Sequence, residues 1–251
     1  MIQTERLTRH FGALAAVQDL DLAVRPGELF GFLGPNGAGK STTLRLLAGL
    51  LRPTAGTARI AGHDVQTAPL AAKRATGFMP DEPVLYERLT GREFLRFVGG
   101  LYGLDEARIA DRAEQLLSLL DLTARAEDEI QSYSHGMRQK IVLCTALLHQ
   151  PQALLLDEPL SGLDPHSARR VKDVLRDFCQ RGGAVLLSTH TLEIAERLCE
   201  RVGILHHGRL IAVGTMDELR AQAHSAAGAT LEELFLQLTG GSAVAAVAEA
   251  L

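Results

Sequence analysis

The segment GPNGAGKST at residues 34–42 constrains the fold of this chain more than any other part of the sequence. It matches the pattern G-x-x-x-x-G-K-[ST], follows an apolar run predicted to be a strand (residues 28–33) and precedes a predicted helix (residues 40–51). In that context the glycines let backbone N–H groups curl around phosphates, Lys40 brings a positive charge to the β- and γ-phosphates, and the Ser41 hydroxyl suits Mg²⁺. The segment therefore predicts a nucleoside triphosphate site. Its residues are Gly34, Pro35, Asn36, Gly37, Ala38, Gly39, Lys40, Ser41 and Thr42.

Short apolar runs in the second half of the chain predict a parallel sheet. The runs ALLLD (residues 153–157) and AVLLS (residues 184–188) suit strands that are buried on both faces. Further strands are predicted at residues 2–8, 17–24, 57–60 and 76–79, and a hairpin at residues 201–214. Residues 90–150 follow a helical pattern almost throughout, as in DEARIADRAEQLLSLL at residues 105–120. The sequence thus predicts a mainly parallel α/β core that a helical insertion interrupts.

Composition and charge argue against several classes of protein. The formal net charge of −4 supplies no strong field for nucleic acid, so no nucleic-acid partner is expected. No stretch reaches about 18 uninterrupted apolar residues, so no membrane span is expected, and the opening MIQTERLTRHF does not resemble a signal peptide. Cys144, Cys179 and Cys199 are odd in number and widely spaced, which favours buried free thiols in a reducing cytosol. We therefore expect a cytoplasmic protein.

Two carboxylates and a histidine follow the predicted strands of the core. Asp157 and Glu158 end one strand and His190 ends the next, so they should meet at the sheet edge where ligands bind. Asp157 would hold Mg²⁺, directly or through water, and Glu158 would orient and deprotonate an attacking water. Taken alone, Asp-Glu is also a common strand end, and a single histidine is more often a solvated or core residue. The pair His206-His207 is interpreted as a hairpin turn, because it lies beyond these strand ends.

In their order, these segments resemble the ATP-binding subunit of ABC transporters. Residues 34–42 resemble its Walker A motif, LLLDEP (154–159) its Walker B motif, SGLDP (161–165) its D-loop and STH (188–190) its switch histidine. The resemblance covers roughly residues 1–215. It implies a P-loop NTPase (RecA-like) core with an N-terminal antiparallel β-subdomain and an inserted α-helical subdomain. It also implies that Phe11 stacks on adenine and that Asp164 of the D-loop belongs to the nucleotide site.

The stretch YSHGM at residues 133–137 stands where the family carries its signature, usually LSGGQ. Ser134 and Gly136 match the signature, whereas His135 and Met137 depart from it. By itself the stretch is also typical of an ordinary helix start with Ser134 as its N-cap. A helix N-terminus offers free N–H groups to an anion. The resemblance implies that this one binds the γ-phosphate of an ATP held by a second subunit.

A second departure is Asp81 in MPDEP, where the family generally has a glutamine that contacts Mg²⁺ and couples the subunit to its permease. A carboxylate can also ligate Mg²⁺. The resemblance therefore implies a metal site of Ser41, Asp81 and Asp157, with coupling to the permease open to change. Residues 83–90 would meet the permease.

The function that the resemblance implies is ATP hydrolysis by a homodimer on the inner face of the cell membrane, where it powers a separate permease. The departures and the short end LEELFLQLTGG favour an exporter of drug, ion or lipid-like cargo. The alternatives are an importer subunit, a non-transport ABC-type ATPase with a long coiled coil or a second ATPase half, and a P-loop kinase. We find no coiled coil, second half or phosphoryl acceptor site in the sequence.

We expect residues 1–218 to form the ATP-binding domain, with the helical insertion at about residues 85–150. Residues 219–251 would form a short helical extension, opened by a capping box of Thr230 and Glu233, and a loose alanine-rich tail after Gly240.

Overall fold

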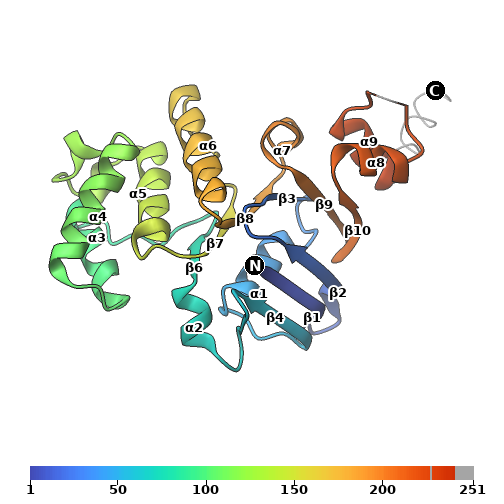
Figure 1. The fold of residues 1–251 in the computed structure, drawn as a ribbon, viewed down its shortest axis with the longest axis horizontal. Coiled ribbons are helices and arrows are strands. Elements are labelled where there is room, and N and C mark those ends of the chain that lie inside the picture. The colour runs from blue at the N-terminus through green and yellow to red at the C-terminus, as the bar shows by residue number, and fades with distance from the viewer. Residues whose placement is uncertain (227, 241–251) are drawn as a thin grey trace.

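The computed structural model describes residues 1–226 and 228–240, so the expected loose tail after Gly240 lies outside the described residues. Figure 1 shows two sheets in the middle of the molecule, a group of helices at one end and the C-terminal helices at the opposite end. Within the described ranges, no helix combines the length and the apolar character needed to cross a membrane.

Ten strands form these two sheets in the described part of the chain. They are β1 (Ile2–Phe11), β2 (Leu14–Val24), β3 (Leu29–Leu33), β4 (Ala55–Ile60), β5 (His63–Asp64), β6 (Thr76–Met79), β7 (Ala153–Asp157), β8 (Ala184–Thr189), β9 (Arg201–His206) and β10 (Arg209–Gly214). A four-stranded antiparallel sheet has the order β2-β1-β4-β5, and a six-stranded sheet has the order β10-β9-β3-β8-β7-β6. The strands of the second sheet pair in parallel except β9 with β10. The predicted α/β class with an antiparallel β-subdomain is confirmed.

The central parallel strands β3, β7 and β8 are buried along their whole length. One hydrophobic cluster covers one face of the sheet and includes Leu154 and Leu187, while a second includes Phe30 and Leu155 and joins the sheet to the antiparallel subdomain. A strand covered on both faces has no polar alternation, which explains the continuous apolar runs in the sequence. The same pairing sets Asp157 beside Ser188 at the carboxyl ends of β7 and β8.

The helices between and beyond the strands are α1 (Lys40–Leu47), α2 (Pro69–Arg74), α3 (Gly91–Leu101), α4 (Glu106–Leu119), α5 (His135–Leu148), α6 (Pro165–Gln180), α7 (Leu192–Leu198), α8 (Met216–Gln222) and α9 (Leu231–Leu238). The sequence pattern did not predict the short helices α2, α7 and α8. It also extended α1 to residue 51, whereas α1 ends at Leu47. A Schellman motif ends it, with Gly49 in the left-handed region (φ +66°) and the Leu50 N–H donating to the Arg45 carbonyl at 2.9 Å.

The helical insertion consists of α3, α4 and α5, coloured green to yellow at one end of the molecule (Figure 1). Each of these helices begins at a side chain that accepts a backbone hydrogen bond: Thr90 for α3, Asp105 for α4 and Ser134 for α5. At the opposite end, Thr230 and Glu233 form the capping box of α9 that the sequence predicted. Leu231 and Leu234 of α9 are buried in a third hydrophobic cluster with β9 and β10. The expected boundary after residue 218 falls inside α8.

A histidine joins the insertion to the parallel sheet. His149, at the end of α5, stacks on the ring of Tyr102 with ring centroids 3.7 Å apart, and its Nε2 donates to the Thr76 carbonyl of β6 at 3.0 Å. A carbonyl only accepts, so Nε2 carries the proton of a neutral ring. Burial lowers the pKa of His149 to about 4. The ring therefore stays neutral at neutral pH and connects α3, α5 and β6.

The buried neutral ring of His149 predicts a loss of stability in mild acid. The pKa of His149 in the folded protein lies below its ordinary value of about 6.5, so its stabilising effect is complete above about pH 6.5 and declines as the pH falls towards 4. Between about pH 7.5 and pH 5 we expect the unaltered protein to lose about 2 kcal/mol more unfolding free energy than His149→Gln. Urea unfolding at both pH values measures the difference, and an equal loss in the two proteins would remove this role of His149.

Candidate nucleotide site

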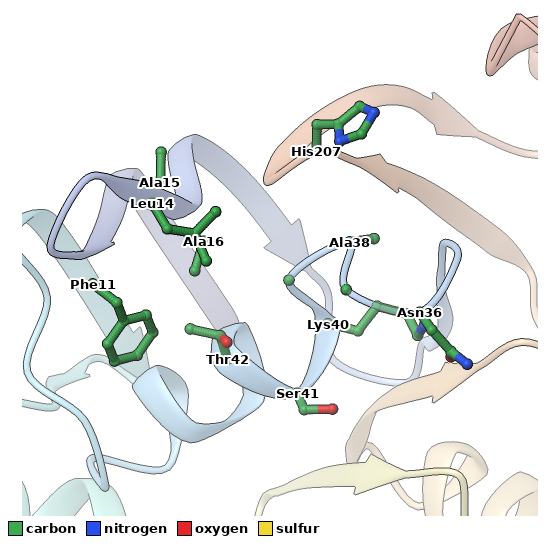
Figure 2. A pocket seen from close by; sticks show the side chains of 12 residues that line it. Phe11, Leu14, Ala15, Ala16, Asn36, Ala38, Lys40, Ser41, Thr42 and His207 are labelled. Carbon is green, nitrogen blue, oxygen red and sulfur yellow. The ribbon is translucent and has the colours of Figure 1, made fainter.

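The predicted phosphate loop, between β3 and α1, lines a cleft of about 420 Å³. Three segments that are far apart in the sequence meet there, namely this loop, the turn between β1 and β2, and the turn between β9 and β10 (Figure 2). The cleft is lined by Phe11, Leu14, Ala15, Ala16, Asn36, Gly37, Ala38, Gly39, Lys40, Ser41, Thr42 and His207. Eight of the predicted site residues thus lie together, and Gly34 and Pro35 begin the same loop.

Two loop glycines leave no room for a side chain. A Cβ on Gly34 would lie 2.4 Å from the Leu205 carbonyl oxygen, and one on Gly39 would lie 2.3 Å from the Ala16 carbonyl oxygen. Gly39 also has φ +107°, which L-amino acids with a side chain rarely adopt. The Gly208 N–H donates to the Ala38 carbonyl at 2.9 Å and so ties the loop to the β9–β10 turn. Glycine is required at these positions because other backbone segments press against the loop.

Lys40 extends along the inside of this loop and is buried. Its Nζ donates to the carbonyl oxygens of Gly34 at 2.6 Å and Pro35 at 3.2 Å. Burial lowers the pKa of Lys40, and the negative charges of three carboxylates oppose that shift. Those carboxylates belong to Glu158, Asp157 and Asp81, so the structure brings the loop lysine and the predicted acidic residues together.

The ends of β7 and β8 hold two of these carboxylates in place. Asp157 is buried and accepts a hydrogen bond from the Ser188 hydroxyl at 2.7 Å. Glu158 accepts from the Thr189 hydroxyl at 3.1 Å and from the His190 N–H at 2.8 Å. The Nδ1 of His190 lies 2.7 Å from the same Glu158 oxygen, Oε1. The expectation that Glu158 and His190 share one sheet edge is confirmed by these contacts.

Asp81 follows β6, the next strand of the sheet. Partial burial raises its pKa most, and the negative charges of Asp157 and Glu158 raise it further. Such mutual repulsion favours a cation at this edge. Within residues 1–226 and 228–240, no three His, Cys, Asp or Glu side chains converge closely enough to hold a metal by themselves. Mg²⁺ usually keeps several waters and takes only one or two carboxylates plus phosphate oxygens, so this arrangement fits Mg²⁺ that arrives with a nucleotide.

Phe11 lies at one side of the cleft and is 44% exposed. The Arg9 guanidinium covers the ring at 4.5 Å from its centroid. In Figure 2 Phe11 and the Ser41 hydroxyl lie on opposite sides of the start of α1. The cleft therefore has an aromatic side and a phosphate side.

His207 is a cleft residue that the sequence reasoning missed. The predicted hairpin is confirmed, with His207 in its turn and His206 as the last residue of β9, but His207 also lines the cleft, contrary to its placement beyond the strand ends. The reason is the pairing of β9 with β3, which brings the β9–β10 turn over the loop that follows β3. In the sequence, only the turn itself signals this position.

Three further predicted site residues lie at the starts of α5 and α6 and not in the lining of the cleft: Ser134, Gly136 and Asp164. Ser134 is the N-cap of α5, and its hydroxyl accepts from the Met137 N–H at 3.4 Å. Asp164 is the N-cap of α6, where its carboxylate accepts from the backbone of His166 and from the hydroxyl of Ser167. These hydrogen bonds lower the pKa of Asp164. The chain thus presents two separate groups of candidate residues.

The chain is similar to known proteins of one family. The family model described as "ABC transporter" matches residues 17–161. The daunorubicin/doxorubicin resistance ATP-binding protein DrrA of Streptomyces peucetius is 41% identical over 224 residues, which make up 89% of this chain and 68% of that protein. A solved ATP-binding subunit of an ABC transporter has a TM-score of 0.90 and 37% identity, covering 95% of this chain and 99% of its own. A solved dimeric ATP-binding cassette with bound ADP and Pi is similar in fold (TM-score 0.79, 23% identity, 86% of this chain and 99% of its own).

The crowded loop predicts that Gly39→Ala binds nucleotide more weakly. The new Cβ would displace the loop from Ala16, and losing the hydrogen bonds of about two loop amides should weaken ATP binding by about a hundredfold. Gly182→Ala is the matched control, because Gly182 also has a positive φ (+89°) but nothing within 4 Å of its Cβ position. Calorimetric titration with ATP measures both, and unchanged affinity in Gly39→Ala would contradict this account.

Proposed function

We propose that this chain, which belongs to the ABC transporter family as an ATP-hydrolysing subunit, closes as a homodimer over two ATP–Mg²⁺ and so drives a separate membrane permease. The observation that carries the proposal is the convergence of Lys40 with Asp81, Asp157 and Glu158 at the carboxyl edge of the parallel sheet. These four residues would supply a positive charge for phosphate, carboxylates for a metal ion and a base, all beside one cleft.

ATP would lie with its phosphates in the loop and its adenine towards Phe11, which lines the aromatic side of the cleft. Lys40 would exchange its bonds to the Gly34 and Pro35 carbonyls for the β- and γ-phosphate oxygens. Ser41, Asp157 and Asp81 would hold Mg²⁺, which supplies charge neutralisation for the phosphates. The raised pKa of Asp81 supports this assignment, since a cation would relieve its repulsion from Asp157 and Glu158.

Glu158 would orient the attacking water and accept its proton. Its carboxylate is held from two sides, by the Thr189 hydroxyl and by the His190 N–H, so it keeps one orientation. The imidazole of His190 is 64% exposed and reaches Glu158 through Nδ1. It would therefore lie beside both the proposed base and the γ-phosphate. The γ-phosphate would then pass to water while Lys40 stabilises its charge.

A second copy of the chain would complete each site. Ser134 and Gly136 lie at the N-terminus of α5, a helix of 14 residues, and the described lining of the cleft does not include them. Their phosphate would therefore belong to the partner, with Asp164 on the same surface of the chain. The cassette solved as a dimer with ADP and Pi supports this arrangement by analogy.

The permease would bind where the insertion meets the core. A groove of about 560 Å³ lies there, lined in part by Leu50, Leu70 and Leu101, which are 56%, 74% and 72% exposed. Residues 83–90, expected at the same interface, include Val84 with 91% exposure. Apolar surface of this kind is typical of a protein interface. The subunit would sit on the inner face of the cell membrane.

Export is the direction of transport that we propose, for drug, ion or lipid-like cargo. The similarity to DrrA, which is named as a daunorubicin/doxorubicin resistance protein, supports this direction. The division into an ATP-binding domain (1–218) and a helical extension (219–251) stays a proposal; α9 begins at a capped Thr230, but its leucines are buried against β9 and β10.

The role of Glu158 predicts a trapped dimer. Glu158→Gln keeps the shape of the side chain but removes the base, so hydrolysis should slow by about a hundredfold or more while ATP still binds. With ATP and Mg²⁺, size-exclusion chromatography should then show a dimer that the unaltered protein forms only transiently. Turnover at the unaltered rate would exclude Glu158 as the base.

A mixing experiment tests whether Ser134 serves the partner's ATP. Ser134→Arg should block the helix end and Lys40→Ala should disable the loop, so each variant alone should be inactive. A mixed dimer has one site with both defects and one with neither, because the intact Lys40 of one chain faces the intact Ser134 of the other. A mixture should therefore recover a fraction of the ATPase rate.

Heterodimer formation in ATP must be measured in parallel. Heterodimers that form but never hydrolyse ATP would count against sites that are shared between chains and work independently. Full activity of Ser134→Arg alone would leave Ser134 as an N-cap only.

A further inference from the structure

His135, one of the two residues that depart from the family signature, contacts the D-loop of its own chain. A Cβ placed on Gly162 would lie 2.1 Å from the His135 Cδ2 and 2.7 Å from its Nε2. Real side-chain carbons do not approach a ring so closely, so the imidazole occupies the space that a side chain at position 162 would need. The position of the His135 ring and the absence of a side chain at Gly162 are therefore mutually dependent.

The backbone beneath the ring is also closely packed. A Cβ on Gly136 would lie 3.3 Å from the Gly162 carbonyl oxygen, so the first turn of α5 lies directly on the D-loop. Gly162 has φ +69°, a left-handed conformation that glycine adopts without strain. Met137, Leu160 and Leu163 pack against the same hydrophobic cluster. The start of α5 and the D-loop thus form one contact region.

The D-loop continues directly from the candidate base. The Ser161 N–H donates to the Glu158 carbonyl at 3.1 Å and closes a turn between the strand end and Gly162. Glu158 itself has φ +48°, an uncommon conformation for a residue with a long side chain. Such a conformation persists only where its surroundings hold it. A displacement of Gly162 would therefore act on this turn and on the orientation of Glu158.

We propose that His135 is a positioning residue that connects the phosphate-binding end of α5 to the turn bearing Glu158 in the same chain. The proposal rests on the proposed function, because the phosphate at Ser134 and Gly136 then belongs to the partner's ATP. Binding of that phosphate would fix the start of α5, and the His135 ring would hold Gly162 and thereby Glu158 in the conformation for hydrolysis. Each ATP site is thus coupled to the other through a packing contact of one imidazole on one glycine.

A double-mutant cycle on the ATPase rate tests this contact. Gly162→Ala should lower kcat by about tenfold with ATP affinity unchanged, because the methyl group displaces the His135 ring. His135→Gly removes the obstacle, so the double variant should hydrolyse ATP within about threefold of His135→Gly alone. His135→Phe, which keeps a ring of similar size, should keep kcat within about twofold.

Gly62→Ala is the matched control for the glycine. Gly62 also has a positive φ (+83°) and nothing within 4 Å of its Cβ position, and it lies in the turn between β4 and β5. It should keep the unaltered kcat, which separates backbone strain from the contact with His135. Thermal unfolding of the four proteins of the cycle (the unaltered protein, Gly162→Ala, His135→Gly and the double variant) measures the contact independently of activity.

The outcomes separate this inference from the proposed function. If the unaltered protein is active and the effects of Gly162→Ala and His135→Gly on kcat and on melting temperature simply add, the coupling is overturned. The ATPase assignment would then stay intact. Loss of kcat in His135→Phe would also overturn it, because the role would then be that of imidazole nitrogens. A parent protein without any ATPase activity would instead refute the proposed function, and with it the functional role of the contact.

Discussion

The close approach of three backbone segments around the phosphate loop is the constraint on which the rest of the site depends. The carbonyl of Ala16 presses on Gly39 and the carbonyl of Leu205 on Gly34, so only hydrogens separate the loop from its neighbours. Gly208 continues this contact, with hydrogen bonds to Gln18 and to Ala38. A loop held in this way keeps its N–H groups oriented before a ligand arrives, and binding then costs less ordering entropy.

The parallel sheet fixes the charges relative to that loop. β3, β8 and β7 are neighbours, so the loop after β3 lies at the same edge as Asp157, Glu158 and His190. Hydrogen bonds from Ser188 and Thr189 hold the two carboxylates, and Lys40 offsets part of their charge. Buried charges are stable only when they are paired or hydrogen-bonded, and this edge satisfies that condition with room left for a cation.

The helical insertion presents the other candidate surface and meets the core at defined contacts. His149 connects it to β6 through one hydrogen bond and one ring stack, and the start of α5 touches the D-loop at Gly162. The first contact lies beside the groove that Tyr102 lines, and the second lies one turn from Glu158. Movement of the insertion would therefore affect both the proposed permease groove and the proposed base.

The sequence by itself determined the features that depend only on residues close together in the chain. The phosphate loop is one such feature, because its glycines, Lys40 and Ser41 follow each other directly and stand between a strand and a helix. The buried strand β7, with Asp157 at its end, and the capping box of α9 are others, since apolar runs and short-range side-chain bonds specify them locally. Even the early end of α1 has a local signal, because Gly49 is the residue that adopts the left-handed conformation.

Only the tertiary structure decided those contacts between distant segments that no motif or strand end signals. His207 reaches the cleft because β9 pairs with β3, and neither turn chemistry nor apolar periodicity specifies that strand order. His135 likewise meets Gly162 across the boundary between insertion and core. Each contact joins residues more than twenty positions apart, and its geometry follows from the packing of whole elements. A pattern in the sequence records the local preference of the backbone, whereas the fit between packed elements exists only once they are folded together.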